Sequence, residues 1–298
     1  MAQHRFESTG TLAWDASLAA SIDDLRIDAS APVDGLTARL ERALRTYGFA
    51  LLHSLAADGE TALDARLEQL GRRLGRIVQQ SPRGELVEDV RDVSDLLAEK
   101  DDRGYRSGGE LSPHSDPPTL IVLHCVAAAR SGGESHLVNV ASIADRLAAD
   151  DPGPLDVLHG RFPAWRVEGE AGRAAGPHEH TIPVLAERDG VTSCVLYRPF
   201  TEKAALALGR PLTAEQVHAL DAFDRHSHDP ALSLRFRLAP GDTLVLHNRA
   251  VLHARTDYED WPELERRRHL KRLWIDAPER LPVHPAHELG DIFATRTV

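Results

Sequence analysis

The amino-acid sequence predicts an α+β protein with a jelly-roll core, also called a double-stranded β-helix, and flanking helices. Two observations predict it. Leucines recur with helical spacing in the first quarter of the chain, and short strand-like runs separated by turn signals follow from Leu120 onward. Helices followed by many strands are typical of an antiparallel core. No G-x-G-x-x-G motif follows a strand, which disfavours a doubly wound nucleotide-binding fold.

The N-terminal part reads as two helices around one buried strand. Leu36, Leu40 and Leu44 lie four residues apart and predict a helix over about 34–46, and "FALLHSL" at 49–55 then predicts a strand. A second helix is predicted over 60–75, where one stripe contains Leu63, Leu67, Leu70 and Leu74. The stretch 81–110 is polar and irregular, so we expect it to include a loop.

The rest of the chain reads as strands joined by turns, with two helices among them. "VASIADRLAADDPGP" predicts a short helix stopped by Pro152 and Pro154, and Thr213-x-x-Gln216 is a capping box that opens a helix over about 214–225. Asp189-Gly190 is a favoured hairpin turn within "TIPVLAERDGVTSCVLYR". Further strands are predicted in "TLIVLHCV", "HLVNV", "LSLRFRL", "PGDTLVLHN", "AVLHART" and "RRHLKRLWID". We expect one domain over 1–298, with a helical and strand part over about 1–105 and the jelly-roll core over about 106–280.

Composition limits the partners of the chain. The net charge of −11 argues against nucleic acid, and no apolar run of about 18 residues is present to span a membrane. The first residues lack the basic and apolar pattern of a secretion signal, so we expect a cytoplasmic protein. Cys125 and Cys194 lie in apolar runs and are expected to be buried thiols, with a disulfide as the alternative. A small-molecule substrate is the expected partner, and homodimer and homotetramer are both open.

A histidine and an aspartate stand two residues apart just before an apolar run. His114 and Asp116 point the same way if this segment is extended. An imidazole and a carboxylate side by side are two of the three ligands of the facial triad that non-haem Fe(II) oxygenases use, which leaves positions open for substrate and oxygen. A third ligand would be a histidine from elsewhere, and His253 lies 139 residues downstream in a predicted strand. A solvated His–Asp pair is the alternative.

An arginine-rich strand follows His253. In "RRRHLKRLW", Arg268, Leu270, Arg272 and Trp274 share one face by strand alternation. Two arginines that project into a barrel interior require anionic partners, and an enclosed dicarboxylate would supply them through charge-assisted hydrogen bonds. The alternative is an edge strand whose arginines lie in water.

Taken together, these blocks resemble the TauD/TfdA family of Fe(II)/2-oxoglutarate dioxygenases. The resemblance covers about 110–140 and 238–276, and "YGFALLHSL" fits the N-terminal part of the family. The blocks that carry it are "ELSPHSDPP", "LIVLHCV", "GGESHLVNV", "PGDTLVLHNRAVLHARTDYED" and "RRRHLKRLWI".

The resemblance implies roles for individual residues. His114, Asp116 and His253 would be the iron ligands, and Arg268 would grip the far carboxylate of 2-oxoglutarate. Arg267 has a competing register but points to the opposite face. Arg272 matches the second arginine of the family's pattern, near a carboxylate of 2-oxoglutarate or a substrate anion; Ser135 replaces a threonine that contacts 2-oxoglutarate; and Asn248 matches an asparagine expected to hold the backbone.

Residues for substrate binding are less specified. Glu110, four residues before His114, would suit an amino-bearing substrate, and Tyr197 and Arg198 end a strand that faces the pocket; for each, a structural role is the alternative. The segments 81–89 and 172–181 read as lid loops. The His-x-His spacings at 177–180 and 225–229 are interpreted as solvated histidines. His247, six residues before His253, lacks the family's strand pattern and is not preferred as a ligand.

The function implied is hydroxylation of an unactivated C–H bond in a small polar substrate, amino-acid-like or a natural-product intermediate as in antibiotic biosynthesis. Fe(II), 2-oxoglutarate and O2 would be required, succinate and CO2 released, and ascorbate would help in vitro. One alternative is a catabolic dioxygenase that cleaves a sulfonate, sulfate or aryl ether through an unstable hydroxylated product. Alternatives of other classes are a non-catalytic jelly-roll binding protein and a zinc hydrolase, which also accepts histidine and carboxylate ligands.

Overall fold

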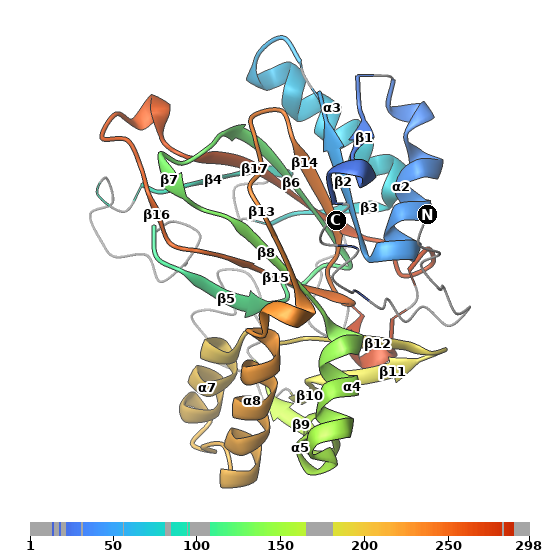
Figure 1. The fold of residues 1–298 in the computed structure, drawn as a ribbon, viewed down its shortest axis with the longest axis vertical. Helices are drawn as coiled ribbons and strands as arrows, with labels where there is room; N and C mark the ends of the chain where they lie inside the picture. The colour runs from blue at the N-terminus through green and yellow to red at the C-terminus, as the bar shows by residue number, and fades with distance from the viewer. Residues whose placement is uncertain are drawn as a thin grey trace.

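The computed structural model describes residues 14, 18, 22–30, 32–55, 57–80, 85–93, 95, 108–164, 181–281 and 283–288. They form a mixed α and β structure (Figure 1): two sheets lie together, helices α2 and α3 lie beside one of them, and a helical layer lies at the other end. Among the described helices, none has both the length and the apolar composition that crossing a bilayer requires.

The larger sheet combines strands from the two ends of the chain. Its order is β1 (Ile27–Asp28), β2 (Phe49–His53), β14 (Thr243–His247), β6 (Leu120–Ala127), β17 (His269–Asp276) and β3 (Arg76–Val78), and β4 (Val87–Arg91) also pairs with β17. The pairings are antiparallel except for β1 with β2. The strands before residue 105 therefore continue the sheet that the later strands form.

The smaller sheet has four strands. They run in the order β13 (Ser233–Phe236), β8 (Ser135–Asn139), β15 (Val251–Arg255) and β5 (Leu111–His114), each pair antiparallel. A two-stranded ribbon of β7 (Ser131–Gly132) and β16 (Tyr258–Glu259) extends the loops at one end of this sheet.

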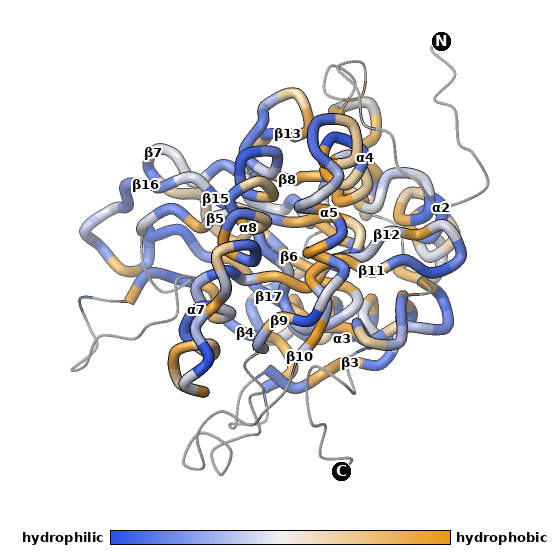
Figure 2. Tube along the Cα trace, turned by 90° about the horizontal axis from the view of Figure 1, so that it is seen from below, coloured by the Kyte–Doolittle hydropathy of each residue, from blue (hydrophilic) through white to orange (hydrophobic). Residues whose placement is uncertain are grey.

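Alternating side chains give the larger sheet two buried faces. On β2, Ala50 and Leu52 pack with the leucines of α2 (Thr37–Tyr47) and α3 (Glu60–Leu74). Phe49 and Leu51, on the other face, pack with residues of the smaller sheet such as Leu137 and Val251. This is the period of two expected of a strand, and it explains why "FALLHSL" is apolar throughout. Figure 2 shows apolar stretches of β6 and β17 toward the middle of the molecule.

The helical layer has its own apolar core beyond the end of the smaller sheet. Leu147 and Leu158 pack there with Leu220 and Phe223. The layer contains α4 (Val140–Asp150), α5 (Pro152–Leu158), β9 (Arg161–Pro163), β10 (Thr181–Pro183), β11 (Leu185–Arg188), β12 (Val191–Cys194), α7 (Arg198–Ala207) and α8 (Ala214–Ser227). Short 3-10 turns complete the structure: η1 (Ile22–Leu25), η2 (Val33–Gly35), η4 (Pro230–Leu232), η5 (Leu264–Arg266) and η6 (Pro285–His287).

Several local predictions are confirmed. Gly48, in the left-handed conformation at φ 72°, ends α2 and donates its amide to the Leu44 carbonyl at 2.9 Å. Asp189 and Gly190 both have positive φ and join β11 to β12. Thr213 and Gln216 form the reciprocal capping box of α8. Both cysteines are free and buried.

Two predictions need correction. Pro152 begins a helix as well as following one: Asp151 caps α5 by accepting from the Gly153 amide at 3.1 Å, and proline is favoured in a first turn because it needs no amide donor there. The stretch 81–110 is also not wholly irregular, because β4 lies inside it and pairs with β17. The short alternation in "VEDVR" is its only signal in the sequence.

Candidate metal centre

The two predicted histidine ligands lie opposite one another on neighbouring strands. His114 is the last residue of β5 and His253 the third of β15, and the two are register partners. Directly paired residues in an antiparallel sheet point to the same face. Their ring centroids are accordingly 4.3 Å apart. The strand pairing therefore brings together two residues that are far apart in the sequence.

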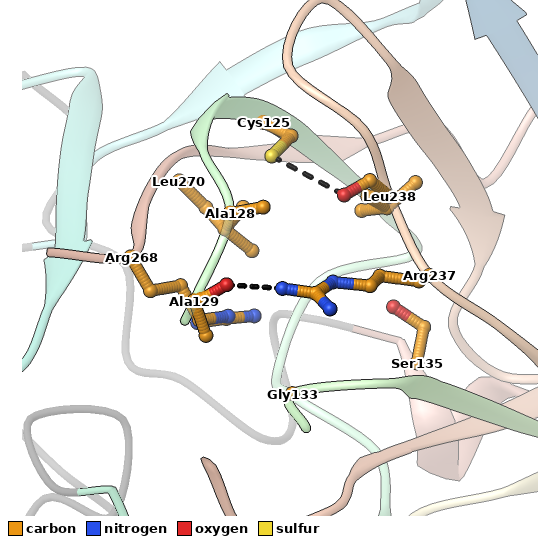
Figure 3. Close-up of a pocket in the computed structure, with 9 residues that line it drawn as sticks. All are labelled: Cys125, Ala128, Ala129, Gly133, Ser135, Arg237, Leu238, Arg268 and Leu270. Carbon is orange, nitrogen blue, oxygen red and sulfur yellow. Dashed lines mark hydrogen bonds between the residues drawn. The ribbon is translucent and has the colours of Figure 1, made fainter. Parts of the chain in front are cut away.

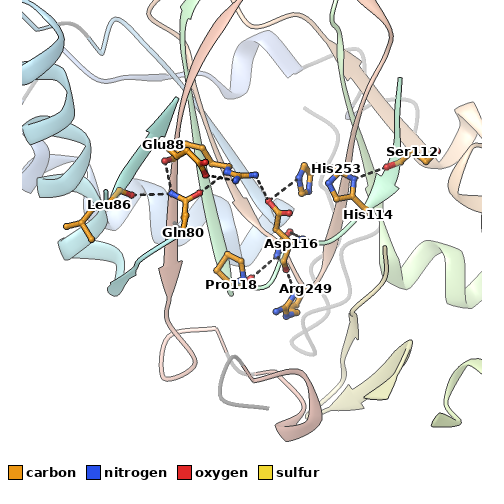
Figure 4. A network of polar contacts seen from close by, with 11 residues as sticks. Gln80, Leu86, Glu88, Ser112, His114, Asp116, Pro118, Arg249 and His253 are labelled. Carbon is orange, nitrogen blue, oxygen red and sulfur yellow. Dashed lines mark hydrogen bonds and ion pairs between the residues drawn. The ribbon is translucent and has the colours of Figure 1, made fainter. Parts of the chain in front are cut away.

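Asp116 follows β5 in a proline-rich loop whose backbone is held by β14 and its following turn (Figure 4). The Asp116 amide donates to Oδ1 of Asn248 at 3.1 Å, and Nδ2 of Asn248 donates to the carbonyls of Asp116 at 2.5 Å and Pro118 at 2.7 Å. Asn248 thus holds the backbone beside the predicted ligand, as expected from the sequence.

Arg249 supports the same loop and was missed by sequence reasoning. Its side chain is 1% exposed and donates to the carbonyls of Asp116 at 2.6 Å, Pro117 and His287 at 3.1 Å. Burial lowers its pKa to about 10, which leaves it charged at neutral pH. An arginine next to Asn248 in a buried segment was the available signal, but its partners arise only from the tertiary fold.

The three side chains meet in one place. One ligand atom from each of His114, Asp116 and His253 lies within 4.8 Å of the others, and in the described part of the chain this is the one such group of three metal-ligating residues. Nε2 of His253 is 3.9 Å from Oδ2 of Asp116. The ring of His114 donates from Nδ1 to the Ser112 carbonyl at 2.8 Å, which leaves the lone pair of Nε2 for a metal ion.

Electrostatics give the site the protonation states that a metal requires. Burial, together with the neighbouring His114, lowers the pKa of His253 to about 3, so its imidazole is neutral. Burial acts to raise the pKa of Asp116, but Arg272 and the two neighbouring histidines together outweigh it, and the pKa lies below its usual value. A donor set of two imidazoles and one carboxylate fits a divalent ion and leaves open coordination positions.

Arg272 lies against Asp116 rather than in an open cavity. Nη1 donates to Oδ2 of Asp116 at 3.2 Å, Nη2 to Oε2 of Glu88 at 2.9 Å, and Nε to Oε1 of Gln80 at 2.8 Å (Figure 4). Glu88 lies in the stretch 81–110, which was expected to include a loop, and Gln80 lies just before it, so sequence reasoning missed both. Acceptors of the chain itself surround this guanidinium, which holds the same Asp116 oxygen, Oδ2, that lies nearest His253.

Arg268 and Ser135 line a cavity between the two sheets (Figure 3). Arg268 is 7% exposed and Ser135 is 9% exposed. Gly133, in the left-handed conformation at φ 70°, lets the loop before β8 pass beside Arg268, where an added Cβ would lie 3.5 Å from that side chain. Arg267 points elsewhere and forms a two-bond ion pair with Asp95 at 2.6 and 2.7 Å.

The sheet register relates this cavity to the metal centre. His253 pairs with Leu137, and Ser135 lies two residues before Leu137 on β8. Residues two apart point to the same face, and two residues of strand span about 7 Å. Ser135 therefore shares the face of His253 at roughly the length of a five-carbon diacid.

The predicted substrate residues have different surroundings. The Tyr197 ring lies 5.2 Å from the His114 ring and 4.7 Å from Phe200, and burial raises the pKa of Tyr197. Arg198 forms ion pairs with Glu202 at 2.8 Å, Asp221 at 2.8 Å and Asp224 at 2.6 Å. Glu110 is exposed just before β5.

The remaining sequence predictions concern His247, the two lid loops and a His-x-His spacing. His247 is buried in β14, outside the group of three ligands. Of the predicted lid loops, 81–84 and 172–180 lie outside the described residues, as does the His-x-His spacing at 177–180.

Two imidazoles and a carboxylate beside an arginine-lined cavity define a non-haem metal site of the oxygenase type. Residues 10–274 match the family model described as "Taurine catabolism dioxygenase TauD, TfdA family", and the chain belongs to this family. It is therefore an oxidoreductase, as the sequence predicted, of a family that uses Fe(II), 2-oxoglutarate and O2.

Individual relatives agree with this assignment. The chain is 29% identical over 244 residues to FR-33289 synthase of Streptomyces rubellomurinus (strain ATCC 31215), covering 80% of this chain and 71% of the relative. It is 30% identical over 253 residues to uridine-5'-phosphate dioxygenase of Amycolatopsis sp, covering 78% and 86%. Human gamma-butyrobetaine dioxygenase is 24% identical over 175 residues, covering 56% of this chain and 44% of the relative.

Solved structures share the fold. Asparagine oxygenase (AsnO) superposes with a TM-score of 0.63 at 21% identity, covering 87% of this chain and 84% of that one. The non-haem iron oxygenase OrfP in complex with Fe and alpha-ketoglutaric acid has a TM-score of 0.59 at 15% identity, covering 88% and 85%.

Proposed function

We propose that this protein is an Fe(II)/2-oxoglutarate-dependent dioxygenase that hydroxylates an unactivated C–H bond of a small polar substrate, with release of succinate and CO2. The observation that carries the proposal is the convergence of His114, Asp116 and His253, with a buried arginine beside a cavity on the same face of the sheet. Neither the three ligands nor the arginine-lined cavity specifies a cosubstrate by itself. Together they suit an iron ion and a keto diacid that binds it.

His114, Asp116 and His253 would hold the iron. When bound, Fe(II) supplies the oxidising chemistry that couples decarboxylation of 2-oxoglutarate to hydroxylation. The chain supplies positioning: the Ser112 carbonyl sets the tautomer of His114, Asn248 and Arg249 fix the Asp116 loop, and Arg272 holds one carboxylate oxygen.

Arg268 and Ser135 would bind the far carboxylate of 2-oxoglutarate. Arg268 has no carboxylate partner among the described residues, and its pKa is lowered by burial, so an incoming anion would stabilise its charge. The separation of about 7 Å between the Ser135 and His253 positions suits a molecule whose keto acid end faces the metal and whose other end faces Arg268. Arg272 would act on Asp116 rather than on the cosubstrate.

The substrate would lie beside Tyr197, whose ring is next to His114. Relatives named for uridine-5'-phosphate, FR-33289 and asparagine, and the OrfP complex with (3S)-hydroxy-L-Arg, support an amino-acid-like or natural-product substrate. Glu110, exposed at the entry to β5, remains our candidate for an amino group. The two packed sheets would be the halves of a double-stranded β-helix within a single domain, because N-terminal strands complete the larger sheet.

The test is succinate release from 2-oxoglutarate by Fe(II)-loaded protein with ascorbate, screened against metabolites such as amino acids and nucleotides. We expect succinate formation to increase with one substrate class and a hydroxylated product to appear in equal amount. If metal-loaded protein binds 2-oxoglutarate yet yields no succinate with any substrate, a non-catalytic binding protein becomes the better assignment.

A further inference from the structure

The cavity that contains Arg268 holds a second guanidinium. Arg237, one residue beyond β13, lines the same space as Arg268, Ser135 and Cys125. Figure 3 shows the two arginine side chains entering from opposite sides and directing their guanidinium groups toward the space beside Ala129 and Ser135. Arg237 is not among the residues that the sequence predicts to bind a ligand.

Among the described residues, no carboxylate forms an ion pair with either guanidinium group, although the charge of Asp260 acts on Arg268. Arg237 donates to the Ala129 carbonyl, a neutral acceptor. Arg268 lies over the Tyr258 ring at 5.3 Å, and the nearby carboxylate of Asp260 is bound by the Arg268 amide at 2.7 Å. Burial raises the pKa of the Cys125 thiol to about 11, so this group is neutral as well.

Asp242, whose charge acts on the Cys125 thiol of the cavity lining, is already paired. Asp242 forms an ion pair with Arg26 at 2.7 Å and accepts from the Ala239 amide at 2.9 Å. Arg268 is buried whereas Arg237 is exposed; two like charges at one cavity repel each other, and an anion between them removes that repulsion. The Ser135 hydroxyl adds a neutral donor to the same space.

We propose that Arg237 is a second binding residue for the far carboxylate of the keto diacid and makes the site selective for dicarboxylates. Arg268 contacts this carboxylate from the buried side and Arg237 from the solvent side. The inference rests on the proposed function. It goes further because it names Arg237, which lies outside the arginine-rich strand. It also predicts a selectivity for dicarboxylates that is stronger than Arg268 alone would give.

The experiment compares two ligands by calorimetry on protein loaded with Zn(II), which binds without turnover. One ligand is 2-oxoglutarate; the other is 2-oxopentanoate, in which a methyl group replaces the far carboxylate. The variants are R237Q, R237K and R235Q. Arg235 lies two residues away on β13, is exposed and does not line the cavity, so it is the matched control.

We expect R237Q to weaken 2-oxoglutarate binding about tenfold or more, the size of one charge-assisted hydrogen bond, without changing 2-oxopentanoate binding. R237K should recover part of the affinity, and R235Q should bind as the unaltered protein does. An unchanged Kd for 2-oxoglutarate in R237Q, or an equal loss for both ligands, would overturn the inference. Failure of the unaltered protein to bind 2-oxoglutarate would instead overturn the proposed function.

Discussion

Arg268 and Arg272 lie four residues apart on the same stretch of chain, and both are buried, yet their surroundings differ. Arg272 is held by Glu88, Gln80 and Asp116, so acceptors of the chain itself satisfy its charge. Arg268 lines a cavity and has no carboxylate partner among the described residues. A buried charge without a partner is costly, so its presence indicates a ligand that arrives later. We therefore propose that Arg272 belongs to the architecture of the metal centre and that Arg268 binds the cosubstrate.

Removal of the carboxylate at the centre of the Arg272 network should have the largest effect. D116A eliminates a ligand atom and leaves Arg272 with one acidic partner fewer. We expect hydroxylation to fall by more than the roughly 10–100-fold that outer partners of a metal ligand contribute, and Fe(II) binding to weaken in parallel. Succinate release and equilibrium metal binding are the measurements. Full activity in D116A would remove Asp116 from the metal site.

Truncation of Arg268, which lines the cavity, should weaken binding of the cosubstrate alone. R268A removes the charge that faces the cavity, so we expect the KM for 2-oxoglutarate to rise about 100-fold while the KM for the substrate changes little. R267A is the matched control, because Arg267 pairs with Asp95 outside the cavity. An equal rise in the KM for 2-oxoglutarate in R268A and R267A would mean that Arg268 has no specific role in binding the cosubstrate.

Substitution of Glu88, the buried partner of Arg272, should have the opposite effect: it should change the stability of the protein rather than cosubstrate binding. E88Q leaves Arg272 with a neutral partner at a site where both side chains are largely buried. Since loss of one member of a buried ion pair costs roughly 3–5 kcal/mol and glutamine keeps one hydrogen bond, we expect the free energy of unfolding to fall by about 2 kcal/mol.

Urea denaturation measures this change, and E110Q, at an exposed glutamate, should stay within about 0.5 kcal/mol of the unaltered protein. A tenfold rise in the KM for 2-oxoglutarate in E88Q, with stability unchanged, would place Arg272 among the ligand-binding residues instead.

The sequence predicted the parts of this site that local pattern determines. His114, Asp116 and His253 were found because short motifs flank them, and strand alternation correctly separated Arg267 from Arg268. Glu88, Arg249 and Arg237 were missed because each acts through a neighbour far away in sequence. No local pattern records such a contact. Strand β4 was likewise missed, because its five residues give only a weak alternation between polar stretches.

Substitution of Arg198 should have the smallest effect of the variants considered, and it can be compared with substitution of its neighbour Tyr197. Its guanidinium joins α7 to α8 through Asp221 and Asp224 and also pairs with Glu202 of α7 itself. The ring of Tyr197 lies beside that of His114 instead. Because these carboxylates are partly exposed, we expect R198A to lower the free energy of unfolding by about 1 kcal/mol or less and to leave the substrate KM unchanged. Y197A should raise that KM by removing a ring beside the metal centre. If R198A instead raises the substrate KM and Y197A does not, the guanidinium leaves α8 to meet the substrate, and the sequence-based assignment of Arg198 holds.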